Sequence, residues 1–154
     1  MNYQEIIEYF ETVSGLMSNQ VRFEHGWAME VNEEPEGEGL FFFPHIQLNP
    51  PSWVDSVYDN EDVYEIDLYI LTNKYIDEGH SVKRDFAEAI TELQDLAKEY
   101  LLKLFDTENQ VRIYNEAVLR EASKPQIRPN EDISNKGDYS ISIKFKVGVP
   151  KAQC

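Results

Sequence analysis

The sequence predicts an α+β fold in which helices pack on an antiparallel sheet. Two stretches carry this prediction. In Val63–Leu71, apolar and polar residues alternate with a period of two, which is typical of a strand with one buried face. In Ser81–Phe105, apolar residues recur along one broad helical stripe. A strand and a helix that are each apolar on one side predict a two-layer core.

The composition indicates one domain, residues 1–154, with an unusual charge. Hydrophobic residues make up 42% of the chain, and 29 acidic residues against 14 basic ones give a net charge of −15. Such a charge repels nucleic-acid phosphates and anionic membranes, so it disfavours conventional DNA binding. No apolar run approaches the roughly 20 residues of a membrane helix, and the start MNYQEIIEYF lacks the features of a secretory signal. We expect a protein that is soluble and intracellular, or part of a structure that is assembled inside a cell, with no membrane partner.

The first part of the chain predicts a helix and a hairpin. Residues 3–18 place apolar side chains at helical spacing. Residues 21–31 and 40–48 alternate as strands, and Pro44 in the second strand suggests an edge position or a bulge. Residues 32–39, NEEPEGEG, have no apolar anchor and predict a loop. The two strands are therefore predicted to form a long hairpin with this acidic loop at its tip.

The remaining segments complete the predicted order α-β-β-β-α-β-β. Residues 49–62 are expected to connect the hairpin to the central strand. After the long helix, residues 110–119 suggest a strand, with a helix as an open alternative. Residues 121–137 are polar with two prolines and predict a loop. Residues 139–149 alternate as a final strand, and residues 150–154 are expected to fray.

No residue pattern indicates an enzyme, a cofactor or a metal. His25 and His45 lie on adjacent predicted strands and could form a metal pair, but close zinc-type spacing is absent, so we predict ordinary sheet histidines. Cys154 is a poor nucleophile because its segment is expected to fray. Gly37 and Gly39 lie among glutamates that would repel phosphate. We therefore predict no catalytic, cofactor-binding or metal-binding residues.

Two predicted strands are apolar on both faces. Phe41 and Phe43 face opposite to Phe42, and Tyr69 and Leu71 lie on the acidic side of their strand. The second face of each strand must be covered either by the chain itself or by another subunit. Phe41, Phe43, Tyr69 and Leu71 are therefore candidate subunit-interface residues.

The order of the elements, the size and the acidity of the chain resemble a known protein class over residues 3–149. The segments that carry the resemblance are VRFEHGWAMEV, LFFFPHIQL, VYEIDLYIL and DFAEAITELQDLAKEYLLKLF. They resemble the tail-terminator and tail-completion proteins of tailed bacteriophages, while the polar residues 121–137 depart from that pattern. The resemblance implies an N-terminal helix, an antiparallel sheet with a long hairpin, a long helix packed on the sheet, and assembly into rings.

The function implied is that of a structural virion protein, a ring subunit of the head–tail connector or tail. Its partners would be copies of itself, neighbouring connector or tail proteins, and DNA that passes through without sequence-specific contact. A ring around DNA benefits from a negative wall, so Glu33, Glu34, Glu36 and Glu38 are candidate lumen or rim residues. A simple solvated hairpin tip remains the alternative for this loop. Alternative functions are an acidic binding module that inhibits a basic protein or mimics nucleic acid, and an enzyme with an unrecognised site.

Overall fold

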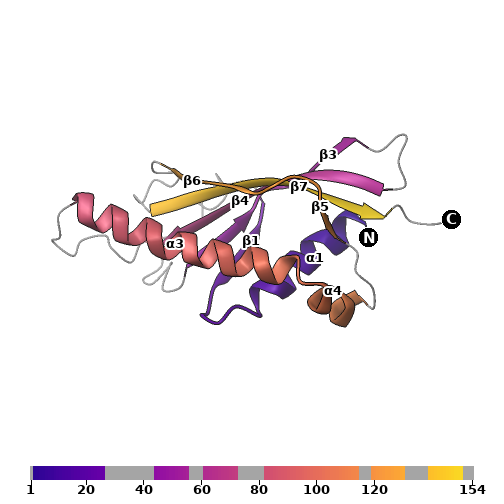
Figure 1. The fold of residues 1–154 in the computed structure, drawn as a ribbon, viewed down its shortest axis with the longest axis horizontal. Coiled ribbons are helices and arrows are strands. Elements are labelled where there is room, and N and C mark those ends of the chain that lie inside the picture. The colour runs from indigo at the N-terminus through magenta and orange to yellow at the C-terminus, as the bar shows by residue number, and fades with distance from the viewer. Residues whose placement is uncertain are drawn as a thin grey trace.

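The protein is a two-layer α+β structure in which helices cover one face of a seven-stranded sheet (Figure 1). The computed structural model describes residues 2–26, 44–55, 61–72, 82–114, 119–130 and 139–150. The elements in chain order are α1 (Tyr3–Ser14), β1 (Arg22–His25), β2 (His45–Leu48), β3 (Ser52–Asp55), β4 (Glu61–Thr72), α3 (Val82–Leu104), α4 (Thr107–Tyr114), β5 (Arg120–Glu121), β6 (Gln126–Asn130) and β7 (Tyr139–Pro150).

Helix α1 begins with a capping box. The Asn2 side chain accepts a hydrogen bond from the Glu5 backbone N–H at 2.8 Å, and the Glu5 carboxylate accepts one from the Asn2 N–H at 3.1 Å. These bonds satisfy two of the donors that every helix start leaves open. The helix ends at Ser14 rather than at the predicted residue 18, because the chain turns at Gly15.

Strands β4 and β7 form the centre of the sheet. They pair antiparallel over twelve residues, from Glu61 opposite Pro150 to Thr72 opposite Tyr139. Their apolar side chains face the helices, and the largest group of buried residues includes Ile66, Leu68, Ile141 and Ile143. The predicted central strand, long helix and final strand are therefore confirmed.

The predicted hairpin is wrong, because β1 and β2 pair parallel and not antiparallel. Arg22 lies opposite His45 and His25 opposite Leu48. A parallel pair needs a long connection and not a tight turn, and residues 27–43 connect these two strands. Gly26, which directly follows β1, has a φ of 148°, a backbone conformation that favours glycine and ends β1 at His25. Residues 27–31 of the predicted strand lie outside the described residues.

Three further predictions are corrected by the structure. Strand β3 lies within the predicted connection 49–62, and β6 lies within the predicted loop 121–137. Both are short strands that pair with the long central ones, β3 with β4 and β6 with β7. Residues 107–114 form helix α4, so the strand predicted from residue 110 is wrong there and the helical alternative is correct.

Two reciprocal hydrogen bonds join the helices in the core. The Tyr100 hydroxyl of α3 donates to the Phe10 carbonyl of α1 at 2.8 Å, and the Tyr9 hydroxyl of α1 donates to the Leu104 carbonyl of α3. Both tyrosines are fully buried, and burial raises the pKa of Tyr100 well above its usual value, with Tyr9 adding to the rise. No helix in the described part of the chain is long and apolar enough to cross a membrane.

Candidate interaction surfaces

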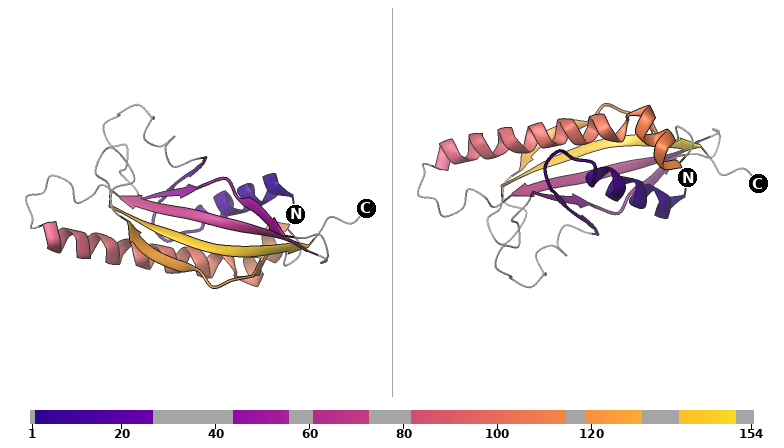
Figure 2. Two further views of the ribbon diagram at one scale, coloured as in Figure 1. Left: turned by 90° about the horizontal axis from the view of Figure 1, so that it is seen from above. Right: turned by 90° about the horizontal axis from the view of Figure 1, so that it is seen from below.

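The sheet has one face that the described helices do not cover. Figure 2 shows the sheet in front of α1 and α3 from one side and behind them from the other. Because side chains alternate along a strand, the residues between the core positions point to this second face. The register places Glu65, Asp67 and Tyr69 of β4 beside Lys146, Lys144 and Ser142 of β7. This second face is therefore polar, and its two ends differ in burial.

One end of the polar face is buried within the chain itself. Leu71 is 1% exposed, and its register partners His45 and Ser140 are both 0% exposed. Internal cover therefore accounts for Leu71, whereas Tyr69 is half-buried. Burial raises the pKa of Tyr69, as expected for a phenol partly removed from water.

The other end of the polar face is open and carries positive charge. Arg128 of β6 lies opposite Ser142 of β7, on the same face as Lys144 and Lys146, and Lys124 precedes β6. All four side chains are exposed. We refer to Lys124, Arg128, Lys144 and Lys146 as the cationic strip.

The cationic strip borders two adjacent hollows in the surface. One, of about 560 Å³, is lined by Lys124, Lys144 and Lys146 together with Glu65 of β4. The second, of about 280 Å³, is lined by Arg128 and Lys144. Among the residues that the structure describes, no ion pair or side-chain hydrogen bond engages any of the four cations. Their charge is therefore available to an anionic partner.

Helix α3 carries the opposite charge on one stripe. Four acidic residues are spaced four, three and four positions apart, so they share one side of the helix; we call them the acidic helix face: Glu88, Glu92, Asp95 and Glu99. They line an open groove of about 620 Å³ that also includes Asn19 and Leu96.

Glu99 lies at the C-terminal end of the acidic helix face, where Ser18 fixes its carboxylate. Its two carboxylate oxygens accept hydrogen bonds from the Ser18 N–H at 2.8 Å and the Ser18 hydroxyl at 3.0 Å. These bonds hold the pKa of Glu99 below its usual value, and the nearby charge of Lys103 acts in the same direction. The hydrogen bonds from Ser18 therefore keep Glu99 anionic and tie the chain after α1 to α3.

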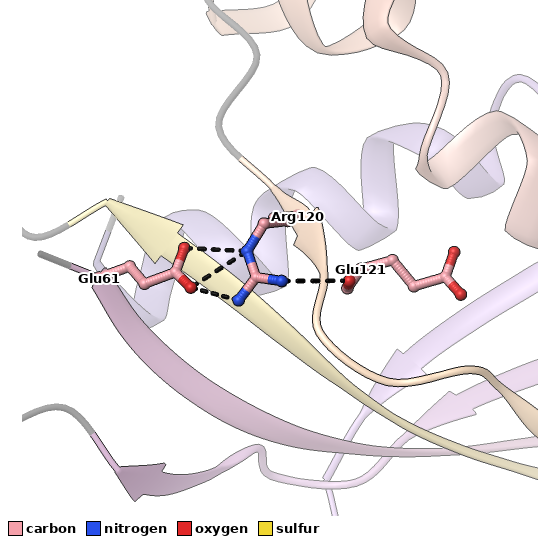
Figure 3. A network of polar contacts seen from close by, with 3 residues as sticks. All are labelled: Glu61, Arg120 and Glu121. Atoms are coloured by element: carbon pink, nitrogen blue, oxygen red, sulfur yellow. Dashed lines mark hydrogen bonds and ion pairs between the residues drawn. The ribbon is translucent and has the colours of Figure 1, made fainter. Parts of the chain in front are cut away.

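An ion pair holds β5 at the edge of the sheet. The Arg120 guanidinium donates to both carboxylate oxygens of Glu61, with Nε 3.1 and 3.2 Å from them, and also donates through Nη2 (Figure 3). These hydrogen bonds, together with the positive charge, lower the pKa of Glu61. The pair crosses Gly148 of β7, where an added Cβ would lie 2.8 Å from the Glu61 carboxyl carbon. Glycine at this position leaves room for the bridge.

Aromatic side chains gather where α1 begins, near β3. Tyr3 contacts both His25 and Tyr64, with ring centroids 6.2 and 6.5 Å apart. Trp53 of β3 lies opposite Tyr64 and is 55% exposed, and its neighbour Val54 is 43% exposed. Exposed apolar side chains on a strand that has one partner, β4, among the described strands are typical of a contact surface.

The predicted lumen or rim residues Glu33, Glu34, Glu36 and Glu38 lie outside the described residues, as do Phe41 and Phe43. The structure does place the two strand histidines. His25 Nδ1 lies 3.1 Å from the Leu48 carbonyl, and His45 Nε2 lies 3.7 Å from a Glu24 carboxylate oxygen. Within the described ranges, no three His, Cys, Asp or Glu side chains are grouped as metal ligands would be.

Sequence reasoning missed both charged surfaces. The alternation of residues 139–149 already placed Lys144 and Lys146 on the polar face. Lys124 and Arg128 lay in a predicted loop, so the sequence did not predict that they lie near these lysines. The acidic helix face had a visible signal in its four-three-four spacing. No protein-family model matches the chain, and no curated protein is similar enough in sequence to match it.

Proposed function

We propose that the protein is a structural virion subunit that forms rings at the head–tail connector or tail of a tailed bacteriophage, as tail-terminator and tail-completion proteins do. The observation that supports this best is the one-sided fold. Helices α1 and α3 cover one face of the sheet, and the other face is polar and open at one end. An N-terminal helix and a long helix packed on the sheet are two of the features that the family resemblance implies. The proposal assigns no catalytic role.

The free edges of the sheet support assembly with neighbours. β1 and β3 lie toward one edge, and β5 and β6 lie at the other. Edge strands present unpaired backbone donors and acceptors to a neighbouring chain. Pro129 deprives β6 of one donor, whereas β3 itself contains the exposed Trp53 and Val54. Contacts between unlike surfaces generate rings when the rotation between subunits closes.

The decisive experiment locates the protein. Electron cryomicroscopy of the virion should place it at the head–tail junction or in the tail. Negative-stain images of the purified protein at high concentration should show closed rings with a central hole. A map that places the protein away from any virion tail would overturn the proposal, whereas a monomer in dilute solution would not, because ring subunits can require their neighbours.

The second candidate function is an acidic module that binds a basic protein. It is favoured by the acidic helix face and by the net charge of −15. It predicts a tight one-to-one complex whose affinity falls steeply with added salt, because salt screens charges at a surface. Titration of the protein with basic proteins from the same source, at low and at high salt, distinguishes this function from ring formation.

A further inference from the structure

We infer that the cationic strip is the docking surface for the acidic helix face of a second copy of the chain. This inference rests on the proposed function, and it names the two surfaces that would join neighbouring subunits. It starts from a contrast within one molecule. A chain with a net charge of −15 gathers four of its 14 basic residues on the open end of one sheet face.

The cationic strip carries more positive charges than the neighbouring strand β4 carries negative ones on the same face. The neighbouring acidic residues on β4 are Glu65, opposite Lys146, and Asp67, opposite Lys144. Asp67 already accepts a hydrogen bond from the Asn49 side-chain amide at 3.1 Å. Among the described residues of the two strands, two carboxylates therefore face the four cations of the strip, which leaves a positive excess for a partner.

The acidic helix face matches the strip in charge, size and position. Four residues of α3, from Glu88 to Glu99, span about 16 Å at about 1.5 Å per residue. Arg128 lies opposite Ser142, four residues from Lys146, so the strip spans about 13 Å at about 3.3 Å per residue. Both surfaces border open grooves.

The two surfaces lie on opposite sides of the sheet. Helix α3 packs on the core face of β7 (Figure 2). Lys144 and Lys146 are exposed and alternate with buried residues along β7, so they lie on its polar face. One molecule therefore cannot join its own acidic helix face to its own cationic strip. Contact between the strip of one copy and the helix of the next is head-to-tail, which is the kind of contact that builds rings or filaments and not two-fold dimers.

Zero-length carbodiimide cross-linking tests this contact directly, because it joins a lysine amine to a carboxylate that touches it. A mixture of ¹⁴N- and ¹⁵N-labelled protein identifies links between copies by mass spectrometry. We expect mixed-isotope links from Lys144 or Lys146 to Glu92 or Asp95. A protein that remains monomeric by sedimentation up to about 1 mM, the weak limit of useful affinity, would overturn the inference.

Charge reversal provides the matched test. Lys144→Glu/Lys146→Glu and Glu88→Lys/Asp95→Lys should each weaken self-association by about tenfold or more, because like charges then face each other. An equimolar mixture of these two variants should recover the association. The reversed, negative strip of one variant meets the reversed, positive helix face of the other, and the intact helix face of the first meets the intact strip of the second. The variant that carries all four substitutions should recover self-association. Lys98→Glu, on an exposed part of α3 outside the acidic helix face, is the control and should associate as the wild type does.

The outcomes separate this inference from the proposed function. Rings that are unchanged by the charge reversals would leave the proposed function standing and overturn the inference. Charge reversals that block incorporation into the virion without changing self-association would also overturn the inference. They would show that the cationic strip binds a different protein and not a second copy of this chain. A protein that lies outside any tail, yet shows the mixed-isotope links, would overturn the proposed function and support the contact.

Discussion

At the scale of single residues, Gly148 and the Glu61–Arg120 pair show how one missing Cβ shapes an edge of the sheet. Glu61 is on β4 and Arg120 is on β5, and β7 lies between these strands. The Glu61 side chain passes over residue 148 to reach Arg120, and only glycine, which has no Cβ, leaves this space empty. The stability of β5 should therefore depend on residue 148 as much as on the charged pair itself.

Gly148→Ala is expected to destabilise the protein by up to about 1 kcal/mol, the upper value for an exposed ion pair. The new Cβ meets the flexible end of Glu61, so the bridge is lost while the backbone is unaffected. In an Arg120→Gln background the same substitution should be neutral or stabilising by about 0.4–1 kcal/mol, because alanine restricts the unfolded chain. Urea denaturation of the four proteins in this cycle measures both effects, and equal effects in the two backgrounds would contradict the prediction.

The pKa of Glu99 links stability to pH. Its folded-state pKa is lowered by the two hydrogen bonds from Ser18, so its contribution to stability is present above the unfolded-state pKa and is lost as pH falls through the folded-state pKa. The difference in free energy of unfolding between wild type and Glu99→Gln should be constant above about pH 6 and shrink below about pH 4.

Chemical denaturation across this pH range measures the difference. Ser18→Ala removes one of the two donors and should make the same difference both smaller and less dependent on pH. A gap between wild type and Glu99→Gln that grows on acidification would contradict the assignment.

At the scale of elements, the buried amide of Gln110 ties α4 to the segments on both sides of it. Gln110 donates to the Leu104 and Leu119 carbonyls at 3.3 and 3.2 Å, and its oxygen accepts from the Leu119 N–H at 2.9 Å. Gln110 is 2% exposed. One side chain thus joins the end of α3, helix α4 and the approach to β5.

Gln110→Leu should cost about 2 kcal/mol or more, because it keeps the volume but leaves the buried Leu119 N–H without its acceptor. Gln4→Leu, on the exposed side of α1, is the matched control and should change stability by less than about 0.5 kcal/mol. Thermal unfolding followed by circular dichroism compares the two. A Gln110→Leu protein as stable as the control would show that the amide contacts are not important.

The elements that the sequence predicts well are those whose own pattern decides their structure. β4, β7 and α3 are long, and their apolar residues recur with the period of the element, so periodicity alone identifies them. β3 and β6 are short and depend on pairing with a long neighbour, which no local pattern reveals. In α4, Val111 and Ile113 suggested a strand, although the segment is helical.

The candidate surfaces follow the same rule. The acidic helix face lies on one helix, so its spacing is readable from the sequence. The cationic strip needs Arg128 of β6 beside Ser142 of β7, and this pairing is a tertiary fact. The parallel pairing of β1 with β2 could not be inferred from alternation either, because alternation is the same in both directions.

At the scale of the whole molecule, the net charge of −15 opposes compaction. Raising NaCl from about 0.01 M to about 1 M shortens the screening length from about 30 Å to about 3 Å, so the folded state should be relieved of self-repulsion. We expect the thermal midpoint of dilute protein to rise by about 2–4 °C for each kcal/mol gained. Salt should therefore stabilise the fold while weakening the head-to-tail contact.

Differential scanning calorimetry at several salt concentrations measures this rise. Sedimentation at the same concentrations monitors association, so that the two opposite responses to salt can be separated. A midpoint that falls with salt would show that attractive ion pairs outweigh the overall repulsion.

The position of β7 in the sheet has a consequence for how the chain is made. β7 lies between β4 and the β5–β6 edge and is the last described element to leave the ribosome. Because synthesis adds about 5–20 residues per second, several seconds pass between the synthesis of β4 and that of its partner β7. Nascent chains that are stalled before residue 139 should therefore be cut readily by protease and retained by chaperones. Chains stalled after β7 has cleared the exit tunnel should resist cleavage, because the sheet is completed only when β7 pairs with β4.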